Sequence, residues 1–543
     1  MSSDRNSPPR PNLAVVGGFV RPRETVAQGT LQAAYQTCAA IAKCGDYREI
    51  HVYQETGAHL GARGELALPP SPTCRTFDKL ALIETGERYR AIYVANGEHI
   101  GPVPSLLRPR DDWAPLVFSI GTTHAAAQWQ SLLVSLATES VRATDGFIFK
   151  SRAAERLFQE VWRAWSNRFG FATRAPGPTV VIGNGVDAVL NRRSESLRAA
   201  TRKKIRLRDD DVLFLAFSRL SPGTKGDQRA LVTRWKTVVA SAPQAVLVLS
   251  GAQVDRRFVA ELRSLAQAAG VGDRVLVLEN PFELFANARL GLMSAADAFI
   301  HLSTGAEEAS PLVVQEALAH GLPVVATAWA GLPEMVSEGE NGFLVATTAA
   351  PVPVRFNEGL FGVTDLPISL GASRSVITDF DQVVDRVVQL CEPSLRARFG
   401  AAARTRAEAH DLAAMAKAYL GFFDETSAAA ADAVVSIPRP LVTMDEVLLA
   451  QGARPLDPSA RFRLAAHENL GYLSDEWDGP SIAEASAIVE GLGAGPLTFD
   501  EIAQRLARRS SVHVVSDDRA RRAASETMVR LINFGIVEPD PIS

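Results

Sequence analysis

Short apolar segments alternate with longer segments of helical periodicity along most of the chain. In the first third, the apolar segments indicate strands at residues 13–16, 50–53, 91–94, 116–119 and 146–149. Strands that alternate with helices in this way predict a parallel sheet covered on both faces. Ligands bind at the carboxyl ends of the strands in such sheets, so the residues that follow each strand are the first candidates for a site.

A second series with the same alternation begins after residue 187. Its strands are predicted at 212–217, 247–251, 275–278, 298–302 and 323–327. Residues 346–375 are rich in Pro and Gly and are predicted to form an inserted surface loop. Residues 380–424 return to a helical pattern. The sequence therefore predicts two α/β domains joined near residues 180–187.

The segment 299–345 carries the strongest functional pattern. It is predicted to contain a strand, a polar loop, a helix, a second strand, another helix and a turn. The first helix is predicted to start with Ser310 as N-cap and Pro311 at the first helical position. Free N–H groups and the positive end of the helix dipole suit a phosphate at such a start. Glu308 lies before this helix and Glu316 within it. Because carboxylates repel phosphate, these two are better placed to accept hydrogen bonds from sugar hydroxyls, and the whole pattern describes a nucleotide-sugar site.

The same residues resemble the donor-binding segment of retaining glycosyltransferases of family 4. The two family glutamates, separated by seven residues, match Glu308 and Glu316, and EALAHGLPVVAT, AGLPEMV and NGFLV follow in the family's order. The resemblance implies that Glu308 contacts the donor sugar and Glu316 the ribose. Many members have Gly-Phe-Gly where this chain has Ala309-Ser310-Pro311, a difference that bears on the identity of the sugar. The resemblance covers about residues 12–424.

Other parts of the chain resemble the site of the same family. In FSRLSPGTKGD, Arg219 and Lys225 flank a turn at a strand end, and the resemblance implies that both cations hold the donor diphosphate. His124 resembles a family histidine close to the reacting sugar, and a structural histidine is the alternative. Gly17 and Gly18 end the first strand, where they allow either a close approach of a ligand or a plain strand-to-helix turn. The predicted catalytic residues are His124 and Glu308, and the predicted donor-binding residues are Gly17, Gly18, Arg219, Lys225, Ser310, Leu312, Val313 and Glu316.

Composition and charge argue against several other classes of protein. The 543 residues have a formal charge of −4, which gives no argument for nucleic acid or a membrane surface. The four cysteines form no CxxC pair, which argues against a zinc site or a disulfide framework and fits a reducing cytosol. The first dozen residues lack an apolar core, so no signal peptide is predicted, and no run approaches the roughly 18 apolar residues that span a bilayer. The expected location is cytoplasmic.

Three charged stretches are given structural interpretations. The basic residues 199–208 are predicted to form a solvated helix rather than a nucleic-acid surface. The acidic residues 209–211 are predicted to form a turn before a strand, so no metal site is predicted. The helix at 153–169 carries arginines beside an apolar face. It is predicted to be buried against the sheet, with peripheral contact to an anionic membrane as the alternative.

Residues from about 437 to the end lie outside the family pattern. They are predicted to form a small, mainly helical, winged-helix-like domain with a terminal strand. Three interpretations are open: a structural or oligomerising appendage, a module that binds a protein partner or the acceptor, and a DNA-binding module. Acidic residues among the arginines disfavour DNA.

The predicted fold is α/β, with two Rossmann-like domains that face a cleft in the GT-B arrangement. These domains span residues 12–180 and 181–407, helices at about 408–425 cross back to the first, and 437–543 form the appendage. The resemblance implies retaining transfer of a sugar from a nucleoside diphosphate to an unknown acceptor (a glycan, lipid, peptide or small molecule), with no obligatory metal or other cofactor. The alternatives are a sugar-nucleotide epimerase or phosphorylase on the same fold, and a non-catalytic nucleotide-sugar sensor that acts through the C-terminal module.

Overall fold

The structure is a computed structural model of the whole chain. It forms two compact units, unit 1 (Met1–Arg439) and unit 2 (Pro440–Ser543). The residues that the structure describes are 12–17, 29–44, 47–54, 74–78, 87–95, 114–121, 141–169, 177–221, 226–252, 255–281, 287–305, 308–350, 375–431, 459–465, 482–509, 524, 527–528, 531–532 and 536–540.

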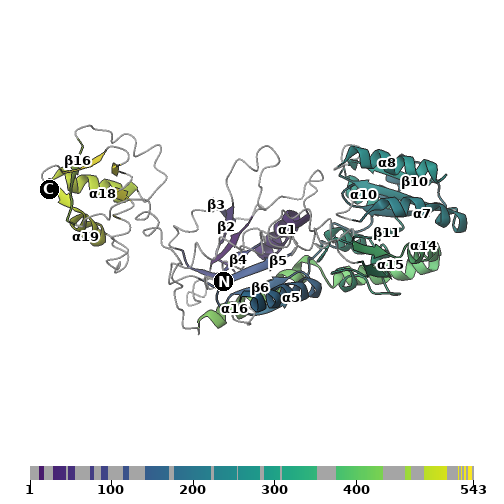
Figure 1. Cartoon of the computed structure of the whole chain (residues 1–543), viewed down its shortest axis with the longest axis horizontal. Helices are drawn as coiled ribbons and strands as arrows, with labels where there is room; N and C mark the ends of the chain where they lie inside the picture. Colours follow the sequence, from purple (N-terminus) through teal and green to yellow (C-terminus); the bar gives the residue numbers. More distant parts are fainter. Residues whose placement is uncertain are drawn as a thin grey trace, which may run out of the picture. The chain divides into compact units, whose positions relative to one another are not determined.

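The first sheet of unit 1 has seven strands, all paired in parallel, in the order β3-β2-β1-β4-β5-β6-β7 (Figure 1). Successive residues of a strand point to opposite faces. Leu13 and Val15 of β1 therefore pack on the side of α1 and α16, whereas Ala14 and Val16 pack on the side of α5. The strands are β1 (Asn12–Val16), β2 (Ile50–Gln54), β3 (Cys74–Asp78), β4 (Tyr89–Val94), β5 (Leu116–Ile120), β6 (Gly146–Phe149) and β7 (Thr179–Val181), and the helices are α1 (Gly29–Cys44), α5 (Arg152–Phe169) and α16 (Leu412–Ala431).

The second sheet has six parallel strands in the order β10-β9-β8-β11-β12-β13. Phe214 of β8 faces the core shared with α7, α8 and α14, and its neighbours Leu213 and Leu215 face the core shared with α10, α11 and α15. The strands are β8 (Val212–Phe217), β9 (Ala245–Gly251), β10 (Val275–Glu279), β11 (Ala298–His301), β12 (Val324–Thr327) and β13 (Gly342–Val345), and the helices are α6 (Glu195–Lys204), α7 (Gln228–Ser241), α8 (Arg256–Ala268), α10 (Ala288–Ala295), α11 (Leu312–Ala319), α14 (Phe380–Gln389) and α15 (Pro393–Glu408).

Most of the predicted strands lie within two residues of the observed ones, with three kinds of difference. β3 and β13 were not predicted as strands. The helix predicted after β12 is a short 3-10 helix, η3 (Leu332–Glu334). α6 starts at Glu195, earlier than the predicted residue 199, because Ser194 caps it by accepting a hydrogen bond from the Leu197 N–H. Within the predicted insertion, β14 (Thr347–Ala349) and β15 (Val376–Thr378) pair antiparallel, and residues 351–374 lie outside the described residues.

The predicted burial of the helix at 153–169 is confirmed only in part, because Leu157 of its apolar face is exposed. Phe158 and Trp162 of α5 are buried. The last helix of unit 1, α16, packs against α1 and β4, so the chain returns to the first sheet after completing the second. None of the described helices is both long enough and apolar enough to span a bilayer.

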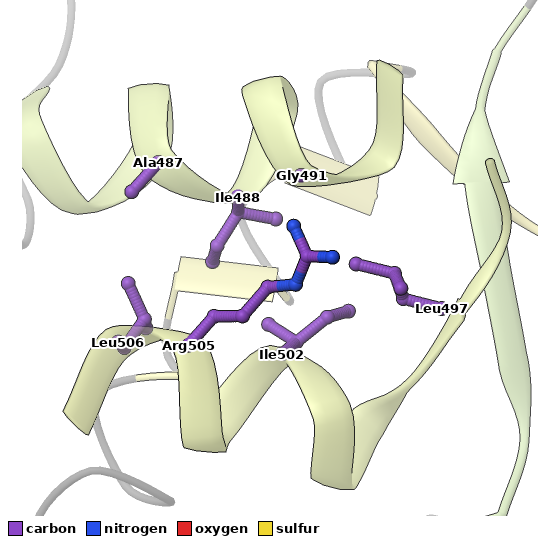
Figure 2. A pocket seen from close by; sticks show the side chains of 7 residues that line it. All are labelled: Ala487, Ile488, Gly491, Leu497, Ile502, Arg505 and Leu506. Atoms are coloured by element: carbon purple, nitrogen blue, oxygen red, sulfur yellow. The ribbon is translucent and has the colours of Figure 1, made fainter. Parts of the chain in front are cut away.

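Unit 2 has a three-stranded antiparallel sheet in the order β17-β16-β18. Two helices pack on it around a core that includes Phe462, Ile488 and Ile502. Figure 2 shows a small hollow between these helices, with apolar side chains on its walls and the Arg505 guanidinium across it. The predicted small C-terminal domain is present. Its elements are β16 (Arg461–Leu464), α18 (Ile482–Gly493), β17 (Leu497–Thr498), α19 (Phe499–Arg509) and β18 (Val537–Pro539).

Candidate active site

The segment between β11 and α11 carries the residues on which the predicted site depends. α11 begins at Leu312, with Pro311 in the N-cap position. The predicted cap by Ser310 is therefore wrong by one residue, and a competing partner explains why. The Ser310 hydroxyl accepts a hydrogen bond from the Asn184 backbone N–H at 3.0 Å, and the Ser310 carbonyl accepts one from the Asn184 side chain at 2.7 Å.

The start of α11 still offers backbone donors. Leu312 and Val313 lie in its first turn, where N–H groups have no intrahelical acceptor. The next N–H, of Val314, donates to the Pro311 carbonyl at 3.1 Å. Two N–H groups at the positive end of the helix dipole favour an anion in front of α11.

Glu308 is buried in the loop before this helix, with 1% of its surface exposed. Its Oε2 lies 2.9 Å from Nε2 of His301, the last residue of β11. Its backbone carbonyl accepts a hydrogen bond from the Gly331 N–H at 2.9 Å. A Cβ at Gly331 would lie 1.7 Å from the Ala309 carbonyl oxygen, so only glycine allows this approach. Both ends of Glu308 are thus fixed by neighbouring segments.

The residues after β12 also hold the first half of the loop. The Thr327 hydroxyl donates to the Ser303 carbonyl at 2.6 Å, and the Trp329 indole N–H donates to the Gly305 carbonyl at 2.9 Å. Each bond occupies a backbone carbonyl that would otherwise compete for a ligand's hydroxyl groups. Ser303 and Gly305 are consequently supported by the segment that follows β12.

Glu316 lies on α11 and is also buried. Its Oε1 forms an ion pair with Arg289 of α10. An ionised carboxylate can accept several hydrogen bonds. Arg289 therefore orients the Glu316 carboxylate, which has the capacity to accept a further hydrogen bond from a hydroxyl.

His320 ends α11 beside this ion pair. Its Nδ1 lies 2.8 Å from the Glu316 carbonyl, and its buried Nε2 has no hydrogen-bond partner in the described part of the chain. Burial, aided by the positive charges of Arg289 and Arg193, lowers the pKa of His320 to about 3. His320 is consequently neutral at physiological pH, and the positive charge next to Glu316 comes from Arg289.

The turn that contains the two predicted diphosphate cations meets the same edge of the sheet. β8 and β11 are neighbours, so residues that follow them adjoin. A Cβ on Gly226 would lie 2.4 Å from the Leu302 carbonyl oxygen, which places the end of the turn directly against the start of the glutamate loop. Arg219 is exposed at the beginning of this turn. Lys225 lies outside the described residues.

The remaining predicted site residues belong to the first sheet. Gly17 is buried at the end of β1, and its N–H donates to the Tyr53 carbonyl at 3.1 Å. Gly18 and His124 lie outside the described residues. The structure therefore brings together Glu308, Ser310, Leu312, Val313 and Glu316, with Arg219 on the adjoining turn.

Contacts between the two Rossmann-like domains of unit 1 converge on this segment. The Glu334 carboxylate accepts hydrogen bonds from the backbone N–H groups of Arg152 and Ala153, at 2.9 Å and 3.1 Å, and so caps α5 of the first domain. Ala309, from the glutamate loop, packs into the core on the α5 side of the first sheet. Together with the bonds between Asn184 and Ser310, these contacts tie the loop to the first domain.

Two charged stretches make contacts that the sequence did not predict. Arg202, expected on a solvated helix, pairs with Asp297, and so does Arg198, just before the predicted segment. Arg198 also donates to the Ala295 carbonyl at the end of α10. The solvated-helix interpretation is wrong for this face, because the helix end and Asp297 supply negative charge. Asp211 pairs with Arg274 at 2.7 Å and accepts a hydrogen bond from the Arg208 N–H.

Comparisons with known proteins agree with this geometry. Residues 198–351 match the protein family described as "Glycosyl transferases group 1". The match contains Arg219, Lys225 and the whole segment from Glu308 to Glu316. The chain is therefore a glycosyltransferase. No curated protein matches the chain.

Solved structures show where the fold recurs. The chain is similar to Anabaena Alr3699/HepE in complex with UDP, with 20% identity, a TM-score of 0.52, and 76% of this chain and 100% of that chain covered. It is also similar to a glycosyltransferase from Rickettsia africae ESF-5, with 12% identity, a TM-score of 0.51, and 77% and 98% covered. A Candida albicans trehalose-6-phosphate phosphatase N-terminal domain gives 10% identity, a TM-score of 0.52, and 78% and 99% covered. The predicted GT-B fold of two Rossmann-like domains is thereby confirmed.

Proposed function

We propose that this enzyme is a retaining glycosyltransferase of family 4 that moves a sugar from a nucleoside diphosphate to an acceptor. The observation that carries the proposal is the pair of buried carboxylates, Glu308 and Glu316, around the donor-rich start of α11. A helix start suits a diphosphate, and carboxylates suit hydroxyls, so the segment fits both ends of a nucleotide-sugar. The similar Anabaena protein was crystallised with UDP, which supports a nucleoside diphosphate as the ligand.

In this proposal each residue has a separate task. Glu308 accepts hydrogen bonds from the donor sugar, and the Glu316 carboxylate accepts one from the ribose. Arg219, Lys225 and the N–H groups of Leu312 and Val313 stabilise the charge that develops on the diphosphate as the sugar–phosphate bond breaks. The acceptor oxygen bonds to the anomeric carbon from the same face, and its proton passes to the departing phosphate oxygen. His124 is proposed to lie close to the reacting sugar.

We also propose that no metal is obligatory for this reaction. The cations Arg219 and Lys225 supply positive charge to the diphosphate. The acidic stretch at 209–211 does not offer three free carboxylates, because Asp211 is engaged by Arg274 and by the Arg208 N–H. Activity measured with EDTA tests this point, and loss of turnover that manganese restores would contradict it.

A screen of nucleotide-sugars tests the proposed activity. Thermal shifts with UDP-, GDP-, ADP- and dTDP-sugars identify the donor, and mass spectrometry detects the released nucleotide and the product. Lys225→Ala and Arg219→Ala should each weaken binding of the nucleoside diphosphate, by about 2–5 kcal/mol for Lys225, because a buried anion loses a partner. Lys236→Ala, on the exposed face of α7, is the matched control. Unchanged affinity in both site variants would place the diphosphate elsewhere, and binding without turnover would favour a nucleotide-sugar sensor.

Unit 2 is proposed to select the acceptor or a protein partner. It has its own core around Phe462, Ile488 and Ile502, so it is not needed to complete either sheet of unit 1. A truncation after Ala431 keeps the whole of α16 and should retain donor binding and donor hydrolysis while losing transfer to the acceptor. An insoluble truncation, or one that does not bind donor, would show that unit 2 has a structural role.

A further inference from the structure

The last residue of β11 is a buried histidine to which the proposed reaction assigns no role. His301 has 5% of its surface exposed, and its ring stacks on Phe299, two residues earlier on the same face of the strand, with ring centroids 6.3 Å apart and planes 13° apart. The central position of β11 in the sheet, between β8 and β12, fixes the backbone beneath this ring. The position of the imidazole is therefore set by the sheet and by the stacking on Phe299, without a bound ligand.

The imidazole contacts the carboxylate that the proposed function assigns to the donor sugar. Nε2 of His301 lies 2.9 Å from Oε2 of Glu308. An ionised carboxylate only accepts hydrogen bonds, so Nε2 carries the proton and donates. A carboxylate as buried as Glu308 needs such a donor, because burial without a hydrogen bond disfavours the ionised form.

The backbone of Glu308 is fixed independently of this contact. Gly331 donates to the Glu308 carbonyl, and Thr327 and Trp329 hold the carbonyls of Ser303 and Gly305. These bonds set where the loop runs, but they leave the side-chain torsions of Glu308 undetermined. The bond from His301 is a contact to the carboxylate itself, and it contributes to setting the direction of that group.

We infer that His301 is a positioning residue, which holds the Glu308 carboxylate ionised and in the orientation that the donor sugar requires. The inference rests on the proposed function, in which Glu308 contacts that sugar. A misplacement of a contact group slows a reaction even when the group is present. Loss of the imidazole should therefore lower kcat while leaving nucleotide affinity intact, because the diphosphate and ribose contacts lie on α11 and the adjoining turn.

Two substitutions separate positioning from packing. His301→Leu fills similar space without a donor, and His301→Gln places an amide N–H at about the reach of Nε2. We expect His301→Leu to lower kcat about 10- to 100-fold, the loss of one hydrogen bond to a charged group. The KM for the donor and the dissociation constant for its nucleoside diphosphate should change less than about twofold, and His301→Gln should recover most of the rate. His410→Leu, at the end of α15, is the matched control and should leave kcat unchanged.

A third substitution keeps the inference testable if His301→Leu does not fold. His301→Asn places its amide near the position of Nδ1, too short to reach Glu308, so it should be slow where His301→Gln is active. Equal rates for the Gln and Asn variants would overturn the inference. So would a wild-type rate in His301→Leu.

The Glu308→Gln background distinguishes failure of this inference from failure of the proposed function. If Glu308→Gln keeps full activity, the donor site lies elsewhere and the proposed function fails first. If Glu308→Gln is slow, adding His301→Leu to it should cost little more, because both substitutions act on the same carboxylate. Fully additive losses in that double variant would show that His301 acts through another group, and the inference would be wrong.

Discussion

The two buried glutamates of the candidate site are supported in different ways. Glu308 lies in a loop, and a histidine from the neighbouring strand donates to its carboxylate. Glu316 lies on a helix, and Arg289 pairs with its carboxylate, while the adjacent His320 contacts only its backbone carbonyl. Each glutamate thus has a histidine close by, but only one histidine acts on the carboxylate itself.

This difference separates a charged partner from a hydrogen-bond donor that can be neutral. Arginine is always protonated, so Glu316 keeps its counter-charge at every physiological pH. A neutral histidine can donate a hydrogen bond without carrying a full positive charge. In the proposed function, Glu316 serves nucleotide binding and Glu308 contacts the reacting end of the donor.

The largest expected effect separates the two glutamates by the kinetic parameter that changes. Glu308→Gln should lower kcat about 10²- to 10³-fold, the size expected when a group that acts in the transition state is lost. Glu316→Gln should instead weaken nucleotide binding, by about 1–2 kcal/mol for one hydrogen bond to a charged group. Initial rates and calorimetric titration with the nucleoside diphosphate measure both.

Glu340→Gln, an exposed glutamate of the same domain, controls for the loss of charge alone. Two variants that alter the same parameter by the same factor would remove the distinction between the glutamates.

The second effect concerns stability and tests the ion pair between Arg289 and Glu316. Arg289→Leu leaves Glu316 buried without its counter-charge and should lower the free energy of unfolding by about 3 kcal/mol. Arg289→Leu combined with Glu316→Leu should recover much of that loss, because no buried charge is then left unpaired. The midpoint of urea unfolding, compared across the variants, measures the effect.

The surface pair between Arg234 and Asp381, both of whose side chains are more than half exposed, supplies the control. Arg234→Leu should cost no more than about 1 kcal/mol. A cost for Arg289→Leu no greater than for Arg234→Leu would mean that Arg289 does not stabilise a buried carboxylate.

The third effect concerns the pH dependence of stability and tests whether His320, beside Glu316, is neutral in the folded chain. Burial lowers the pKa of His320 to about 3 in the folded chain, against about 6.5 for an unfolded histidine. Below pH 6.5 the unfolded chain therefore binds a proton that the folded chain does not, and stability falls as the pH drops from 6.5 towards 3. At pH 5 this amounts to about 2 kcal/mol relative to pH 7.5. His320→Gln should flatten the acid side of the stability curve.

His410 is the matched control for this titration. Its Nδ1 lies 3.0 Å from the Arg406 carbonyl, four residues earlier, just as His320 contacts Glu316, but His410 is partly exposed. His410→Gln should change the pH dependence of unfolding less than His320→Gln does. Identical pH curves for the two variants would show that burial of His320 is not the cause.

The sequence predicted those parts of the fold whose signal is local. β8 and β6 were predicted to the residue because their apolar runs are buried on both faces. β3 was missed because this edge strand, CRTFD, has no apolar run, and β13 was taken for a turn because it begins within the pair Asn341-Gly342. The local residues favour a turn in the sequence pattern, whereas the strand forms because it pairs with β12.

The residues of the candidate site divide in the same way, into those found from the local sequence and those brought in by the fold. Glu308, Ser310 and Glu316 lie within nine residues and were found from their spacing. Their partners are distant in sequence: Arg289 precedes Glu316 by 27 residues, and Asn184 precedes Ser310 by 126. Such pairs depend on which strands are neighbours, and the hydrophobic pattern does not specify this. His301 precedes Glu308 by only seven residues, and a histidine that ends an apolar strand just before the glutamate loop was the signal that could have identified it.

The smallest expected effect extends the comparison to the contact between the domains. Glu334 caps α5 with two hydrogen bonds and lies three residues after Gly331, whose N–H holds the Glu308 carbonyl. Glu334→Ala should cost about 1 kcal/mol of stability, the value of a helix cap, and speed amide exchange at Arg152 and Ala153. Because the cap joins the segment that supports Glu308 to the first domain, kcat should also fall, by about fivefold at most.

Glu392 makes the cleanest comparison, since its carboxylate caps α15 by accepting a hydrogen bond from the Ser394 N–H within a single domain. Glu392→Ala should have a similar cost in stability and no effect on kcat. Nucleotide affinity should be unchanged in both variants, because neither cap touches Glu316. Equal kcat values for the two variants would show that Glu334 is only a helix cap, and that the loop of Glu308 needs no support from the first domain.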